Sequence, residues 1–191
     1  MKRWLLSCLV SALCTGASYG QVSVTDFQAK INTLNDAIAL KNVSKESDAY
    51  NALSAAMTLQ MGYLASQIDA GKAAYSADNA KAIADSRAAD AEATAAQDEL
   101  VKAIADMNAG KPDAQNAIQK ANEDVKKSRN DRNASTTEKQ KAQQELDDIN
   151  KLNANLNTEK KAYADLQPLK TNIPGNADKI LAALKSFAAT L

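Results

Sequence analysis

Paired carboxylates are the first residues in this 191-residue chain whose type and spacing could do chemistry. Glu123-Asp124 and Asp147-Asp148 each place two acids side by side, and positioned carboxylates can act as general acids and bases. Both pairs lie in sequence that we expect to be helical, where adjacent residues do not face each other. We therefore interpret them as parts of solvated helix faces and predict no catalytic residue.

Nucleophiles and metal ligands are scarce. The chain has no His, and its two Cys are Cys8 and Cys14, in a segment that we expect to be removed. The remainder then cannot build a Ser-His or Cys-His nucleophile or a zinc site, and no Gly-rich phosphate loop follows a strand. The sequence predicts no metal, no cofactor and no enzymatic activity.

A basic stretch covers Lys120–Arg132, but Glu123, Asp124 and Asp131 interrupt it and no aromatic residue lies within it. Nucleic-acid-binding surfaces concentrate basic residues on one face. An ion-paired helix surface explains this stretch better, so we expect no nucleic-acid partner.

Residues 1–20 have the pattern of a secretory signal. Lys2 and Arg3 precede a short apolar run, and small residues come before a cut at Gln21. Lipidation is the alternative, but Cys14 follows Leu13 where a small residue is needed, and Cys8 leaves almost no apolar run. We expect export to the bacterial periplasm or cell surface, or otherwise secretion, with membrane contact only through a lipidated Cys or a ligand-binding mode.

The composition after residue 20 favours long helices. It includes 37 Ala and, once Lys2 and Arg3 are removed, 21 basic and 23 acidic residues with no Cys. Ala has the highest helix propensity, and an Ala-, Glu-, Lys-, Leu- and Arg-rich chain is typical of long helices and coiled coils. No stretch alternates like a strand.

Apolar stripes locate the first two helices. A capping box that begins at Thr25 predicts a helix over about 25–41, with Phe27, Ile31, Leu34 and Ile38 on one face. Residues 42–46 are interpreted as a connection and Ser47 as the cap of the second helix. That second stripe consists of Tyr50, Leu53, Met57, Met61, Leu64 and Ile68, and near its far end Leu100, Val101, Ile104 and Met107 form another.

A turn at 110–113 separates the two long helices, because Gly110 suits a helix end and Pro112 a helix start. The following helix, about 113–167, has a heptad pattern. The predicted seam is Ile118, Ala121, Val125, Ser128, Arg132, Ser135, Lys139, Ala142, Leu146, Ile149, Asn153, Leu156, Lys160 and Tyr163. Pro168 ends this helix, residues 173–175 turn the chain, and Asn176 caps a last helix over about 177–190.

Folding at that turn pairs residues whose numbers add up to about 222. We predict an all-α fold, a long antiparallel coiled-coil hairpin with two short terminal helices packed on its base as a bundle. Residues 21–191 form one helical domain, with an arm at about 76–145 and a base from 25–75 and 146–191. In the alternative, Gly71 is a true turn and the chain forms a compact bundle of shorter helices.

These features predict an exported, non-enzymatic helical protein that works by protein contact or self-association, as a spacer, adaptor or oligomer subunit. The alternatives are a bundle that binds lipid or another hydrophobic ligand and a client-holding periplasmic chaperone. The expected partner contact is an apolar arm tip, made of Leu100, Ile104, Met107, Ile118 and Val125.

Overall fold

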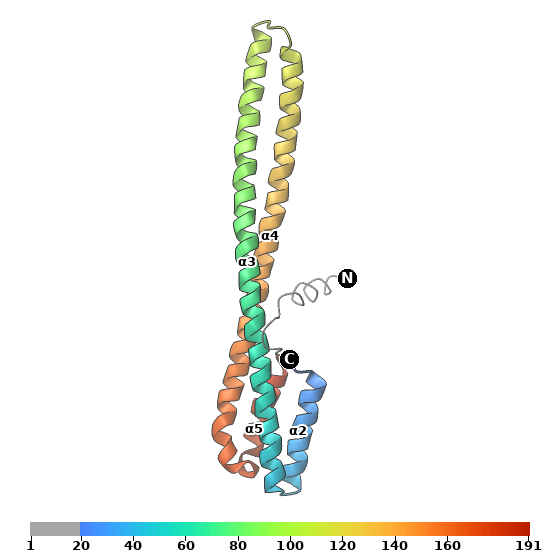
Figure 1. Cartoon of the computed structure of the whole chain (residues 1–191), viewed down its shortest axis with the longest axis vertical. Coiled ribbons are helices and arrows are strands. Elements are labelled where there is room, and N and C mark those ends of the chain that lie inside the picture. The colour runs from blue at the N-terminus through green and yellow to red at the C-terminus, as the bar shows by residue number, and fades with distance from the viewer. Residues whose placement is uncertain (1–19) are drawn as a thin grey trace. The chain divides into compact units, whose positions relative to one another are not determined.

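The computed structural model describes residues 20–191, so the predicted signal segment lies outside the described residues except for Gly20. The elements are four α-helices and two short 3₁₀ helices: α2 (Val24–Ala39), α3 (Val43–Asn108), α4 (Ala114–Leu166), η2 (Gln167–Asn172), η3 (Pro174–Asn176) and α5 (Ala177–Ala188). No strand occurs in residues 20–191. The predicted fold is confirmed: α3 and α4 form a long antiparallel hairpin, and α2 and α5 pack beside its base as a bundle (Figure 1).

Helix α3 continues without interruption through Gly71. A glycine costs about 1 kcal/mol in a helix interior, and the strong helix formers Ala70, Lys72 and Ala73 surround it. The alternative with a turn at Gly71 is therefore wrong.

Two compact units divide the described chain. The first, here called the bundle unit, contains Asp148–Leu191 and the described residues up to Ala70. The second, here called the hairpin unit, contains Gly71–Asp147.

The core of the bundle unit contains most of the predicted α2 stripe and the first part of the α3 stripe, together with residues of α4 and α5. Phe27 of α2 and Phe187 of α5 stack with ring centroids 5.1 Å apart, and both are fully buried. The other large buried members of this core are Ile31, Leu34, Tyr50, Leu53, Met57, Leu166, Ile173, Ile180 and Leu184. The helices buried here are short or polar on one face, so their packing supplies most of their stability.

A hydrogen bond from Tyr50 connects α3 to α4 inside this core. Its hydroxyl donates a hydrogen bond of 2.6 Å to the carbonyl oxygen of Leu166. Burial, and secondarily the neighbouring Tyr163, raises the pKa of Tyr50 above its usual value. The phenol therefore stays protonated and keeps donating at neutral pH.

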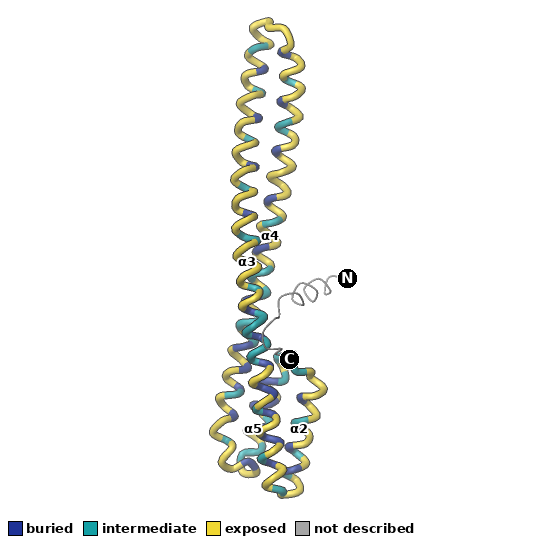
Figure 2. The backbone as a smooth tube through the Cα atoms, in the orientation of Figure 1, coloured by how far each residue is buried: buried dark blue, intermediate teal, exposed yellow. Residues whose placement is uncertain are grey.

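A seam of small residues holds the hairpin unit together. Ala82, Ala89, Ala96 and Ala103 of α3 are buried at every seventh position. Figure 2 shows the buried positions recurring along both helices. The facing buried residues of α4 are Ala114, Ala121, Ser128, Ser135 and Ala142. Only close approach of two helices can cover side chains this short, because interaxial distance follows side-chain size.

The predicted α4 seam is wrong at three of its positions, Arg132 and Lys139 in the middle of the helix and Lys160 near its end, which are exposed. Arg132 and Lys139 are exposed at the seam's edge and reach across to α3. Arg132 Nε lies 3.0 Å from Asp90 Oδ1, and Lys139 Nζ donates to Ser86 Oγ at 2.7 Å. Long polar side chains are better solvated at this edge than inside a narrow seam.

Further ion pairs confirm the predicted register of the hairpin. Lys141 Nζ lies 3.3 Å from Asp78 Oδ2, and Lys81 Nζ lies 3.8 Å from Glu138 Oε1. The hydrogen bond to Asp78, with the charges of Asp78 and Glu145, raises the pKa of Lys141. The side chains of the two cross-helix pairs are substantially exposed, so these pairs set the register more than they stabilise the hairpin.

The α2–α3 turn and the α3–α4 turn each end the preceding helix with the same backbone arrangement. At the α3–α4 turn the amides of Gly110 and Lys111 donate to the carbonyls of Met107 and Asp106, with Gly110 at φ 69°. This is the Schellman arrangement expected from a glycine. Pro112 belongs to the turn and not to α4, which begins at Ala114.

The α2–α3 turn repeats this geometry without a glycine, because Lys41 takes the left-handed conformation at φ 51°. Asn42 then caps α3, accepting a 3.1 Å hydrogen bond from the Lys45 amide. The predicted connection over 42–46 and the cap at Ser47 are therefore wrong. A non-glycine residue in the left-handed region costs about 1–2 kcal/mol, which is why the sequence did not reveal this turn.

Ser23, and not the predicted Thr25, caps α2: Ser23 Oγ accepts a 3.0 Å hydrogen bond from the Asp26 amide. We expect Ser23→Ala to lower the free energy of unfolding of the bundle unit by about 1 kcal/mol. Thr25→Ala is the matched control and should change it by less than about 0.5 kcal/mol. Urea unfolding followed by circular dichroism measures both values. A larger loss from Thr25→Ala would show that Thr25 is the cap.

Between α4 and α5 the chain forms the 3₁₀ helices η2, which contains Pro168, and η3, and Ile173 is a turn residue between them. Asn176 occupies the cap position of α5 but makes no side-chain capping bond. Its Nδ2 instead donates to the Leu169 carbonyl at 3.3 Å. The predicted cap is therefore wrong in its hydrogen bond, while the predicted last helix is confirmed as α5, with Ile180, Leu184 and Phe187 buried on one face.

Candidate interaction surface

The five residues of the predicted tip do not share one environment. Leu100, Ile118 and Val125 are half-buried at the edge of the small-residue seam. Ile104 and Met107 are exposed. The pairing of residues whose numbers add up to about 222 predicted that Ile104 and Met107 would meet Ile118, Ala121 and Val125 of α4; they are exposed instead, and Ala103 occupies the buried position beside them.

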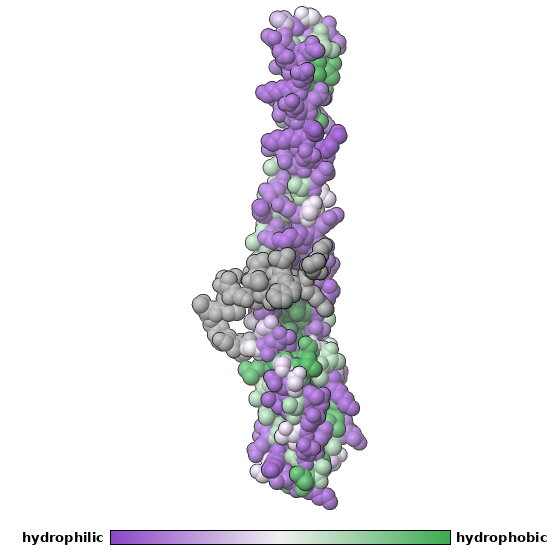
Figure 3. Space-filling view, turned by 90° about the vertical axis from the view of Figure 1, so that its right-hand side faces the viewer, coloured by the Kyte–Doolittle hydropathy of each residue, from purple (hydrophilic) through white to green (hydrophobic). Residues whose placement is uncertain are grey.

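Exposed apolar side chains instead form a strip on α3 near the α3–α4 turn. Val101 is 67% exposed, Ile104 43% and Met107 49%. Residues three apart on a helix are neighbours, so these side chains lie next to one another. Hydrophobic surface is visible close to the turn end of the hairpin unit, among mostly hydrophilic side chains (Figure 3).

Val101 is the member that the site prediction missed. Its place in the stripe 100–107 was visible in the sequence, but the same stripe was expected to face α4. Its high exposure shows that the helix is rotated so that Ala96 and Ala103 face α4 instead. We call Val101, Ile104 and Met107 the apolar strip.

In the carboxylate pair Asp147-Asp148, each acid contacts a residue of its own helix. Asp147 accepts from Gln143 Nε2 at 3.1 Å, and Asp148 pairs with Lys151 at 2.9 Å on the same helix. Asp147 and Asp148 thus each have a local partner on α4. Residues 20–191 also contain no group of three His, Cys, Asp or Glu side chains that could hold a metal ion.

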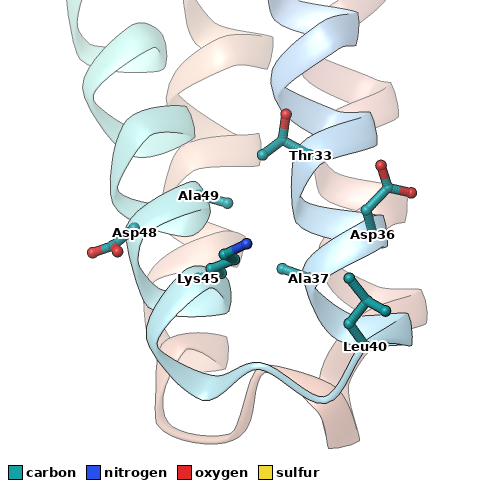
Figure 4. Close-up of a pocket in the computed structure, with 7 residues that line it drawn as sticks. All are labelled: Thr33, Asp36, Ala37, Leu40, Lys45, Asp48 and Ala49. Atoms are coloured by element: carbon teal, nitrogen blue, oxygen red, sulfur yellow. The ribbon is translucent and has the colours of Figure 1, made fainter.

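An open groove of about 270 Å³ lies between α2 and α3 in the bundle unit. Figure 4 shows Ala37 and Ala49 on its walls and the Lys45 side chain reaching across between the two helices. The other lining residues are Thr33, Asp36, Leu40 and Asp48. Small-molecule sites are usually enclosed and mostly apolar with converging polar groups, and this groove is neither enclosed nor convergent.

A buried carboxyl is the most unusual group in the bundle unit. Glu159 of α4 has no exposed surface, and its Oε2 has no hydrogen-bond partner. Burial raises the pKa of Glu159, against opposing hydrogen bonds from Thr190 and Gln60. Sequence reasoning missed it because a single Glu on a polar helix carries no periodic signal.

None of the helices in the described part of the chain is both long and apolar enough to span a membrane. Comparison of the chain with protein-family models, with curated proteins and with solved structures finds no match.

Proposed function

We propose that this chain is an exported, non-enzymatic helical protein that acts by protein contact, as a spacer, adaptor or oligomer subunit. The observation that supports it best is the apolar strip. A side chain of this size gains about 1.5–3 kcal/mol when a partner buries it fully, and the surrounding hairpin surface is polar. The long paired helices provide a stiff support for such a contact.

The strip favours a protein partner with its own apolar helix face. Val101, Ile104 and Met107 stand on one helix at a spacing of three residues, and a helix laid alongside can cover all three at once. The half-buried Leu100 next to them extends the apolar surface toward α4.

A cross-linking experiment tests the strip directly. A photoactivatable residue at Asn108, which is exposed beside the strip, is expected to cross-link a discrete protein or a second copy of the chain. The matched probe is Arg87, an exposed position 21 residues earlier on α3. Because 21 residues are three heptads, both probes point from the same face of the coiled coil.

Ile104→Asp is expected to lower cross-linking from residue 108 by at least tenfold, because a charge would be placed where the partner is apolar. Ile83→Asp is the control, since Ile83 is 40% exposed and lies outside the strip. Ile118 is less suitable because it is half-buried and its replacement would disturb the seam. Cross-linking that survives Ile104→Asp, or that is equal from residues 87 and 108, would contradict the strip as the contact site.

A further inference from the structure

A hydrogen-bonded chain of side chains links four segments of the bundle unit. The Val22 amide, before α2, donates to Gln60 Oε1 of α3 at 3.0 Å. Gln60 is 1% exposed and interacts with the carboxyl group of Glu159 on α4. Thr190, just after α5, lies with its Oγ1 3.1 Å from Glu159 Oε1. Glu159 is thus the point where the segments flanking α2 and α5 meet the two long helices.

The protons of this chain can be counted. Thr190 Oγ1 lies 2.6 Å from the carbonyl oxygen of Phe187 and 3.1 Å from Glu159 Oε1. A hydroxyl has one proton, and a carbonyl can only accept. Thr190 is the donor in both contacts, so its one proton is shared between the Phe187 carbonyl and Glu159 Oε1. An ionised Glu159 would therefore receive only a shared proton at Oε1, while its Oε2 has no hydrogen-bond partner.

The groups that face Glu159 are uncharged. Gln60 comes from α3, Thr190 follows α5, and the Val22 amide reaches it through Gln60. Among residues 20–191, no Lys or Arg forms an ion pair with Glu159. On its own helix, exposed Lys161 pairs with Asp165 at 2.6 Å and Lys160 is exposed. An ionised Glu159 would be a buried charge without compensation, which a folded protein avoids.

We propose that Glu159 is a proton-controlled latch, which closes the bundle over Thr190 and α5 while it is protonated and releases them when it loses its proton. Release lets water reach the carboxylate. Because Leu184 and Phe187 are buried on the same short helix, it also uncovers part of the apolar core. The latch is independent of the apolar strip, which lies in the other unit.

The pH dependence follows from the direction of the shift. The ordinary pKa of the carboxyl is 4.5, and burial raises the pKa of Glu159 in the closed state. The stabilisation from the closed latch is therefore fully present below pH 4.5 and is lost as the pH rises through the raised value. Between the two values, the ratio of open to closed molecules increases about tenfold per pH unit.

Two measurements on the purified protein test the latch. The ¹³C shift of the Glu159 carboxyl, followed by NMR against pH, is expected to titrate above 4.5. Hydrogen exchange of the α5 amides, corrected for the intrinsic pH dependence of exchange, is expected to accelerate about tenfold per pH unit over the same window. Glu159→Gln, which keeps the shape and stays neutral, should make the corrected α5 exchange independent of pH.

Glu138→Gln is the control, since it removes a carboxylate of the same helix that is partly exposed and paired with Lys81. It should leave the pH dependence of α5 exchange as in the unchanged protein. Titration of Glu159 near 4.5 would overturn the proposal. The proposal would also be overturned if α5 exchange in Glu159→Gln kept the corrected pH dependence of the unchanged protein. If that variant fails to fold, the NMR titration of the unchanged protein still tests the proposal.

Discussion

Phe187→Ala is expected to lower the free energy of unfolding of the bundle unit by about 3–5 kcal/mol, the range for Phe-to-Ala changes in protein cores. Phe187 is fully buried and stacks on Phe27 at 5.1 Å between ring centroids. Its removal therefore loses the free energy gained by transferring a large ring from water into the core, and it leaves a cavity against Phe27. The loss is a large fraction of the 5–15 kcal/mol that typically stabilises a domain.

The effect should be confined to the bundle unit, because the buried core that contains Phe187 draws its residues from that unit alone. Near-UV circular dichroism in urea reports this core through Tyr50, which is buried within it. Far-UV circular dichroism follows the helices of both units. We expect the near-UV transition to shift to lower urea while much of the helical signal persists.

Leu59→Ala is the control, because Leu59 is an exposed apolar residue of α3 in the same unit. Its removal should change the free energy of unfolding by less than about 0.5 kcal/mol. A Phe187→Ala loss as small as that of Leu59→Ala would mean that α5 does not pack on the bundle as described.

Ala89→Leu together with Ala96→Leu is expected to destabilise the hairpin unit, by about 1–3 kcal/mol for each overpacked site. Both alanines are almost fully buried in the seam, one heptad apart. The α4 residues of the seam are also small, with Ser128 and Ala121 buried. A Leu side chain can enter only if the helices move apart, which would loosen the contacts of neighbouring small residues.

The matched control moves each substitution by one residue. Ala88→Leu with Ala95→Leu changes exposed positions of the same helix, and Ala and Leu have similar helix propensities. Thermal unfolding, followed by circular dichroism at about 222 nm as a measure of helix content, compares the stabilities of the two double variants. Equal stability of the two, or a more stable seam variant, would show that the helices are not held at a distance set by small side chains.

Much of the secondary structure could be read from local sequence, because it depends on local physical terms. Ala content, the scarcity of Gly and Pro, and apolar residues at spacings of three and four dictate long helices and their inward faces in the bundle unit. Gly110 marked the α3–α4 turn because only glycine adopts its left-handed backbone without cost. The stripes of α2 and α5 were legible because each contains large apolar residues on one face.

Other local features were ambiguous in the sequence. Ser23 and Thr25 are both good caps within one turn of Phe27, and the hydrogen bond to the Asp26 amide selects Ser23. Lys41 gives no sign of a left-handed turn, yet it adopts one at φ 51°. Such a strained residue persists only where the surrounding packing determines the turn.

Tertiary structure decided which residues of the hairpin unit are buried. A two-helix pair buries one narrow stripe, and both the Ala stripe and the Val101-Ile104 stripe of α3 had helical spacing. Small residues on both helices allow close approach along the whole unit, whereas Val101 and Ile104 recur over too short a stretch to set the distance. That choice left the apolar strip exposed.

The buried carboxyl likewise depended on the fold alone. Val22, Gln60, Glu159 and Thr190 are far apart in the chain and belong to no motif. They meet because the antiparallel hairpin sets Gln60 opposite Glu159 and because α5 packs back along α4. Local sequence determined the helices and the apolar faces of the bundle, and the pairing of distant segments determined the seam, the strip and the environment of Glu159.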